Sequence, residues 1–181
     1  MLQKVKLWTD GRASFGDVVL AAIPFDRYRE LPVRALEGKI VIDAMNHYPG
    51  PGAGFPEIAS GATTSSELLA EHLPGAQVVK AFNTMYWRLL AERGWAGSEE
   101  ERLALFVAGD DAEAKARVSA LIEELGFAAV DTGGLAEGGR RQQPGAPIIS
   151  ELARRRREGS DPPGLTKGEA RAALGLPKAW A

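Results

Sequence analysis

Several polar residues stand directly behind short apolar runs, where a strand would deliver hydrogen-bonding groups to a ligand. Asn83 and Thr84 follow the run 78–82, and Asn46 follows the run 38–45. In open α/β sheets, ligands bind in the crevice beyond the carboxyl ends of the strands. We therefore predict that Asn46, Asn83 and Thr84 contact a nucleotide at its ribose, phosphate or nicotinamide amide. Ordinary capping of loops is the alternative.

Two further positions extend this set. Ile23 and Pro24 close the apolar run 17–24. Pro24 could turn the backbone so that it lies against a planar cofactor, or it could simply end the pairing of a strand. Gly133 and Gly134 follow a short apolar segment, and they permit either close approach of a ligand or a turn with positive φ.

Other catalytic chemistries find little support. Asp43 and Asp131 do not form a convincing acid–base pair, and Asp43 is better explained as a strand-end residue that makes structural hydrogen bonds. The only histidines, His47 and His72, lack the spacing of metal ligands. The sequence has no Gly-x-Ser-x-Gly elbow and no phosphate-cradling loop. We expect no metal site, and the sequence identifies no catalytic residue.

Five apolar segments predict the strands that position these residues: 17–23, 39–43, 77–81, 103–108 and 128–130. The first is short, continuous and apolar, which is typical of a fully buried strand. Helical patterns separate the segments. Strand–helix spacing of this kind predicts right-handed βαβ units, and so an α/β fold with a Rossmann-like parallel sheet and helices on both faces.

The helices have recognisable starts and stops. Thr64 and Glu67 have the spacing of a capping box, and Asp110 or Asp111 caps a helix that runs to Leu125. The segment 26–36 contains Pro32, which predicts a kink or a short helix. Helical patterns also occupy 85–93, 147–157 and 167–174.

A loop and a tail complete the organisation. Residues 47–60 are rich in Pro and Gly, and this loop is either a lid carrying His47 and Tyr48 or a solvated surface loop. We predict a single, partial domain over residues 1–181, in which 142–181 form a Pro/Gly-rich and helical tail.

Composition excludes several partners. The net charge of −2 and the pI near 5.8 give no reason to expect nucleic acid. The basic run 154–157 is most simply a solvated helix face. No apolar run reaches the ~20 residues that cross a bilayer, so we expect no membrane partner. The absence of cysteine excludes disulfides and thiolate sites and is consistent with a cytoplasmic location.

Five motifs occur in an order that resembles one protein family. They are DVVLAAIP at 17–24, GKIVIDAMNHYP at 38–49, TSSELL at 64–69, VVKAFNT at 78–84 and AGDD at 108–111. Together they resemble the NADPH-dependent reductases related to NADP:deazaflavin-coenzyme oxidoreductase, over residues 16–145. The resemblance implies a Rossmann domain, NADP(H) as cofactor and hydride transfer between NADPH and a deazaflavin, a flavin or a small acceptor molecule. It also implies a set of cofactor-binding residues: Ile23, Pro24, Asn46, Asn83, Thr84 and Gly133.

The chain departs from that family at its beginning. Members open with a strand, a Gly-x-Gly-x-x-Gly turn and a second strand whose end selects the 2′-phosphate, and this sequence has no such turn. We interpret it as N-terminally truncated, without the helix N-terminus that would hold the pyrophosphate, and activity of this fragment alone is not implied. Gly134 also stands where the family usually has Pro. The alternatives are a non-enzymatic Rossmann-like interaction module and a non-redox nucleotide-binding protein.

The strand 17–23 is expected to be a vulnerable edge. In the complete Rossmann order it would lie beside the first strand of the missing half. Its apolar, β-prone side chains invite pairing with another chain unless the alternating segment 3–8 adds as a strand. A homodimer through this edge is the expected outcome if it does not.

Overall fold

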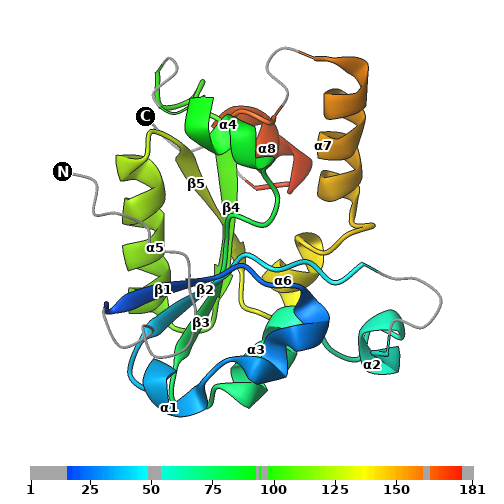
Figure 1. Ribbon diagram of the computed structural model, residues 1–181. Helices are drawn as coiled ribbons and strands as arrows, with labels where there is room; N and C mark the ends of the chain where they lie inside the picture. Colours follow the sequence, from blue (N-terminus) through cyan, green and yellow to red (C-terminus); the bar gives the residue numbers. More distant parts are fainter. Residues whose placement is uncertain (1–15, 49–53, 93, 95–97, 161–163, 177–181) are drawn as a thin grey trace.

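A computed structural model describes residues 16–48, 54–92, 94, 98–160 and 164–176 (Figure 1). The segment 3–8, predicted as an additional strand, lies outside these residues. One sheet contains the strands β1 (Val18–Ala21), β2 (Ile40–Asp43), β3 (Gln77–Lys80), β4 (Ala104–Gly109) and β5 (Ala128–Gly133), in that spatial order. The helices are η1 (Phe25–Glu30), α1 (Val33–Leu36), α2 (Pro56–Ala59), α3 (Ser65–His72), α4 (Trp87–Glu92), α5 (Ala112–Glu124), α6 (Glu137–Arg141), α7 (Pro147–Glu158) and α8 (Lys167–Ala173).

The sheet consists of two parallel units that meet at their carboxyl ends. Strands β1, β2 and β3 are parallel to one another, and β4 is parallel to β5. Between the units, β3 and β4 pair antiparallel through Val79–Gly109 and Lys80–Ala108. The predicted α/β class is confirmed, with a sheet that is mostly parallel. The β3–β4 pair departs from the parallel arrangement that we expected for all neighbours.

The short helix α4 explains that departure. A right-handed crossover between parallel strands needs a helix that packs on the sheet while the chain returns to the amino end. Helix α4 has six residues, a length of about 9 Å, and none of them is buried. It lies at the upper end of the molecule, away from the face of β1–β3 (Figure 1). The chain therefore enters β4 from the far side and runs back toward the end of β3.

A single row of paired residues crosses all five strands. Ala21 pairs with Asp43, Asp43 with Lys80, Lys80 with Ala108, and Ala108 with Gly133. These five residues lie at or next to the carboxyl end of their strands. The row therefore aligns all five strand exits along one line across the sheet, at the edge where α/β sheets bind ligands.

Helices cover both faces of the sheet, as the sequence predicts. Val41 and Val78 are buried against Leu69 of α3 and Tyr28 of η1 on one face. Their neighbours Ile42 and Val79 point to the other face because successive side chains of a strand alternate. There they pack with side chains of α5, among them Val118 and Ile122.

The segment after residue 142 packs on the second unit. Phe106 of β4 and Val130 of β5 form a buried cluster with Ile148 of α7 and Ala170 of α8. Farther along the same face, toward the carboxyl ends of β4 and β5, α6 packs closely on this unit. A Cβ at Gly138 would come within 2.9 Å of the backbone of Thr132, so only glycine allows α6 this close to β5.

Local signals predict the ends of several helices correctly. Thr64 and Glu67 form a capping box, with the Glu67 amide donating to Thr64 Oγ1 at 3.1 Å. Asp111 caps α5 by accepting from the Ala114 amide at 2.7 Å. The segment 26–36 is divided between η1 and α1 at Pro32. The short helices α2 and α6 were not predicted, because α2 lies in a Pro/Gly-rich stretch and α6 contains two glycines.

Strand β1 is more exposed than its sequence predicts. Val18 and Leu20 are 37% and 49% exposed, so the prediction of a fully buried strand is wrong. Among the described residues, no strand pairs with the outer edge of β1. Val18 and Leu20 point to the same face as their partners Ile40 and Ile42, where α5 packs mainly on β3, β4 and β5 and leaves β1 exposed. No helix in the described part of the chain has the length and apolar character needed to span a bilayer.

Candidate functional site

Two asparagines lock the exits of β2 and β3 together. The side-chain amide of Asn46 donates from Nδ2 to the backbone oxygen of Asn83 at 2.9 Å. In return, Asn83 Nδ2 donates to Asn46 Oδ1 at 3.1 Å. The sequence predicted that these residues meet, since each follows the end of a strand and the two strands are neighbours.

The asparagine pair extends to the second unit through Gln142. Asn83 Nδ2 also donates to the backbone oxygen of Gln142 at 2.9 Å. The side chain of Gln142 is buried, and its Nε2 donates to Thr132 Oγ1 at 3.0 Å. Thr132 Oγ1 in turn donates to the backbone oxygen of Val107 at 3.0 Å. The cluster Asn46–Asn83–Gln142–Thr132 therefore joins both halves of the sheet at their common end.

Two acceptor oxygens in this cluster have no donor among the described residues. They are Asn83 Oδ1 and Gln142 Oε1, and both atoms are buried. Rotating the Asn83 amide by half a turn would place its oxygen against two other oxygens, so the hydrogen bonds fix its orientation. A buried polar atom without a partner is costly, and such atoms often mark places where a ligand supplies the missing group.

Backbone strain lies at the same point. Phe82, which precedes Asn83, has φ of 65°. The left-handed conformation costs a bulky side chain about 1–2 kcal/mol. This conformation turns the chain sharply after Ala81 and presents Asn83 to Asn46. Strained backbone of this kind occurs preferentially at ligand sites.

A buried ion pair lies next to the cluster, at the ends of β2 and β3. Lys80 and Asp43, at 1% and 0% exposure, lie 3.1 Å apart between Nζ and Oδ2. Asp43 also accepts from Ser66 Oγ at 2.7 Å and from the Met45 amide at 3.0 Å. Lys80 Nζ donates to the Met45 backbone oxygen at 2.5 Å. The hydrogen-bonding role predicted for Asp43 is therefore confirmed, and these bonds fix the backbone just before Asn46.

Sequence reasoning missed the roles of Lys80 and Gln142. Lys80 carried a signal, because a lysine ends an otherwise apolar strand, as Asp43 ends the neighbouring one. Two opposite charges at equivalent strand ends favour an ion pair. Gln142 carried no such signal, since it stands in a polar stretch between Arg141 and Gln143.

The other predicted residues, Ile23, Pro24 and Thr84, lie just beyond the strand ends and form no side-chain hydrogen bond with Asn46 or Asn83. Ile23 is half-buried and Pro24 exposed, two and three residues beyond Ala21 of the row. Pro24 precedes η1, and its carbonyl accepts from the Arg27 amide. Thr84 is half-buried after Asn83. Their contact with a cofactor stays a prediction.

Gly133 is part of the row itself. It has φ of +111°, and its amide donates to Asp131 Oδ1 at 2.8 Å. A Cβ at this position would meet no atom closer than 3.8 Å, so the positive φ is the local reason for glycine. Gly134 is different, since a Cβ there would lie 2.6 Å from Asp110 Oδ1. That carboxylate accepts from the Leu135 amide and shapes the turn after β5.

His47 is held by aromatic packing. Its ring lies against Phe25 and Phe55, with ring centroids 5.7 and 5.3 Å apart, and it is nearly buried. Tyr48, the next residue, is 71% exposed. In the part of the chain that the structure describes, no group of three His, Asp or Glu side chains is placed to hold a metal ion.

Comparisons with known proteins give three relevant likenesses. The metalloreductase STEAP3 of Rattus norvegicus is 32% identical over 123 residues, which are 66% of this chain and 23% of the rat protein. A hypothetical protein from Sinorhizobium meliloti, whose crystal structure is known, is 36% identical, with a TM-score of 0.64 and coverage of 75% of this chain and 65% of that one. No model of a known protein family matches the sequence.

A third likeness concerns the fold alone. The crystal structure of a candidate F420-dependent NADP-reductase from Arthrobacter sp. FB24 is 24% identical, with a TM-score of 0.59. The match covers 91% of this chain and 67% of that one. The chain thus spans about a quarter of the curated relative's length and about two thirds of the two structural relatives.

Proposed function

We propose that this chain, a Rossmann-like domain related to STEAP3 and to an F420-dependent NADP-reductase, forms the nicotinamide side of an NADP-dependent oxidoreductase site. The likeness to a metalloreductase and to a candidate F420-dependent NADP-reductase supports the proposal. We place the nicotinamide at the row of strand ends that contains Asn46 and Asn83, because polar groups of neighbouring strand exits meet there.

The observation that carries the proposal is the unpaired acceptor Asn83 Oδ1. Both hydrogen bonds of its Nδ2 are already made to oxygens, so the side chain can only offer an acceptor to a ligand. The carboxamide of nicotinamide carries an NH₂ donor, which fits this requirement. Asn46 fixes the backbone of Asn83 and so holds the acceptor in place.

The remaining predicted residues would shape the walls of the same site. Ile23 and Pro24 leave the row from β1 and offer apolar surface to a planar ring. Thr84 offers a hydroxyl beside Asn83, and Gly133 offers a backbone without a side chain at the end of β5. The sequence has no Gly-x-Gly-x-x-Gly turn that would bind the pyrophosphate.

The chemistry would come from the cofactor, and the protein would orient it. With Asn83 orienting the nicotinamide, bound NADPH would supply a hydride, and the acceptor would take it up with a proton from solvent to give NADP⁺ and the reduced acceptor. We propose a deazaflavin, a flavin or another small acceptor molecule. His47 is turned toward Phe25 and Phe55, so no proton transfer is assigned to it.

The test is an NADPH oxidation assay at millimolar NADPH with a flavin and a deazaflavin as acceptors. Asn83→Ala should lower the rate at least about tenfold, because a charge-neutral hydrogen bond and its orienting role are lost. Gln77→Ala is the matched control, since Gln77 is an exposed amide at the amino end of β3, the strand that leads to Asn83. It should leave the rate unchanged.

The two alternatives give different results in this assay. NADPH binding without oxidation would favour a non-redox nucleotide-binding protein. Absence of both binding and oxidation would favour an interaction module. Equal rates for the wild type and Asn83→Ala would contradict the assignment of the site.

A further inference from the structure

Two hollows adjoin on the side of α6 that faces α2. One, of about 420 Å³, lies among residues of α6 and the start of α7, including Arg140, Arg141, Gln143 and Pro144. The other, of about 200 Å³, is lined by His47, Ile58 and Ala59 together with the same Gln143 and Pro144. Because they share a wall, we treat them as one groove, the α6 groove.

The α6 groove begins next to the asparagine cluster. His47, in its wall, directly follows Asn46. Gln143, in both walls, directly follows Gln142, whose backbone oxygen accepts from Asn83. Two residues of the groove, His47 and Gln143, are therefore direct neighbours in the sequence of residues in the asparagine cluster.

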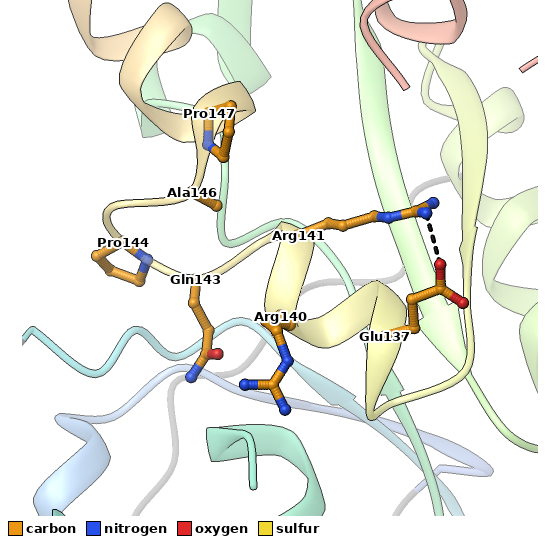
Figure 2. A pocket seen from close by; sticks show the side chains of 7 residues that line it. All are labelled: Glu137, Arg140, Arg141, Gln143, Pro144, Ala146 and Pro147. Carbon is orange, nitrogen blue, oxygen red and sulfur yellow. Dashed lines mark hydrogen bonds and ion pairs between the residues drawn. The ribbon is translucent and has the colours of Figure 1, made fainter. Parts of the chain in front are cut away.

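The two arginines of the groove differ in their partners. Arg141 is paired with Glu137 at 2.5 Å and also donates to the backbone oxygen of Thr132. In Figure 2 it points toward Glu137, which also lines the groove, and away from Arg140. Its charge is therefore neutralised within the protein.

Arg140, in contrast, has no hydrogen bond or ion pair to any described residue. Its side chain and that of Gln143 point to the same side of the α6–α7 connection (Figure 2). Its Nη1 lies 3.1 Å from the position that a Cβ on Gly61 would take, so the glycine leaves the guanidinium room across the α2–α3 turn. A free guanidinium beside a side-chain amide is a set of N–H donors suited to an oxyanion.

We propose that the α6 groove binds an anionic oxygen group, a phosphate or a carboxylate, through Arg140 and Gln143. If the proposed function holds, that anion belongs to the acceptor substrate, which would lie beside the nicotinamide. Binding of the anion itself does not depend on the proposed function. The cofactor's own phosphate is the second source of the same chemistry.

The first experiment titrates inorganic phosphate into the ¹⁵N-labelled protein at constant ionic strength, without any nucleotide. The amide signals of Gly61, Arg140 and Gln143 should shift together, and Arg140→Ala should weaken binding at least about tenfold. Arg140→Lys keeps the charge without the planar fork and should bind with intermediate strength. Arg157→Ala is the control, because Arg157 is an exposed arginine of α7 that also lacks a described partner. It should bind phosphate as the wild type does.

The second experiment separates the sources of the anion. If the anion belongs to the acceptor, Arg140→Ala should raise the KM for an anionic acceptor and leave NADPH binding unchanged. Loss of NADPH binding in Arg140→Ala would assign the groove to a cofactor phosphate. Absence of phosphate shifts at Arg140 and Gln143, or equal weakening by Arg157→Ala, would overturn the proposal. Phosphate binding without NADPH oxidation would leave it standing and would contradict the proposed function.

Discussion

Asn46 and Asn83 are hydrogen-bonded to each other in both directions, although they are 37 positions apart in the sequence. Each bond runs from an Nδ2 donor to an oxygen of the partner, at 2.9 and 3.1 Å. The pair holds two strand exits in register and leaves Asn83 Oδ1 without a donor. The same contact therefore has a structural part, the two hydrogen bonds, and leaves one buried acceptor unsatisfied.

The two hydrogen bonds that Asn83 Nδ2 donates predict that Asn83→Asp destabilises the fold. A carboxylate would face Asn46 Oδ1 and the backbone oxygen of Gln142 in place of the NH₂ group that now bonds both. We expect a loss of about 1–3 kcal/mol in the free energy of unfolding, measured by urea denaturation at neutral pH. Gln77→Glu makes the same chemical change at an exposed position of β3 and should stay within about 0.5 kcal/mol of the wild type. Equal stability of the two variants would contradict the importance of the pair.

The buried ion pair gives a prediction for a double-mutant cycle. Lys80→Met leaves the carboxylate of Asp43 buried without its cation, which should cost about 3–5 kcal/mol. The combined variant Asp43→Asn, Lys80→Met removes both charges and should recover a large part of that loss. Denaturant unfolding of the two single variants and the double variant measures the coupling. Additive losses would show that the two residues do not interact as the structure indicates.

A charge cluster on α7 predicts a dependence on pH. Hydrogen bonds from Arg154 and Arg155 lower the pKa of Glu151 from 4.5 to about 2. A depressed pKa means that the ion pair stabilises the fold above pH 4.5 and that this contribution is lost as the pH falls toward about 2. Glu151→Gln should therefore lower the melting temperature at neutral pH and make little difference near pH 2.

The control for that experiment is Glu124→Gln. Glu124 is exposed near the end of α5 and has no ion pair within the described residues. Its substitution should shift the melting temperature little at any pH. A Glu151→Gln variant that matches the wild type across the whole pH range would rule out a stabilising role for the α7 cluster.

The exposed edge strand predicts self-association. Leu20 of β1 is 49% exposed next to an edge that no described strand covers. We expect the chain to dimerise or aggregate in light-scattering measurements, and Leu20→Lys should shift it toward the monomer. Val33→Lys is matched to it, because Val33 is 39% exposed on α1, away from any strand edge. A monomeric wild type whose β1 amides exchange rapidly with solvent would contradict this prediction.

Local features of this protein were predictable from its sequence because their partners are close in the chain. The capping box of Thr64 and Glu67 spans three residues, and the cap of Asp111 does the same. The meeting of Asn46 and Asn83 was also predictable. It required only that two strands be parallel neighbours, because their exits then coincide.

Features that depend on tertiary packing were not predictable. The antiparallel β3–β4 pair follows from a helix, α4, that is too short and too exposed to form a crossover. The exposure of Leu20 depends on which segments cover β1, and the apolar sequence of the strand does not report it. Gln142 became part of the site only through the fold of α6, which places its backbone oxygen against Asn83.

The central claim is that the row of strand ends binds the nicotinamide end of NADP(H), and titrations of the ¹⁵N-labelled protein with NADPH and with reduced nicotinamide mononucleotide test it most directly. The sequence lacks the pyrophosphate turn, and losing several charge-assisted hydrogen bonds of ~1.5–3 kcal/mol each weakens binding by orders of magnitude. NADPH should therefore not saturate the chain at micromolar concentrations. At millimolar concentrations both ligands should shift the amide signals of Asn46, Asn83, Thr84 and Gly133. Micromolar saturation by NADPH would contradict the claim that this chain lacks a binding site for the pyrophosphate. Shifts confined to residues away from the row would contradict the proposed nicotinamide site.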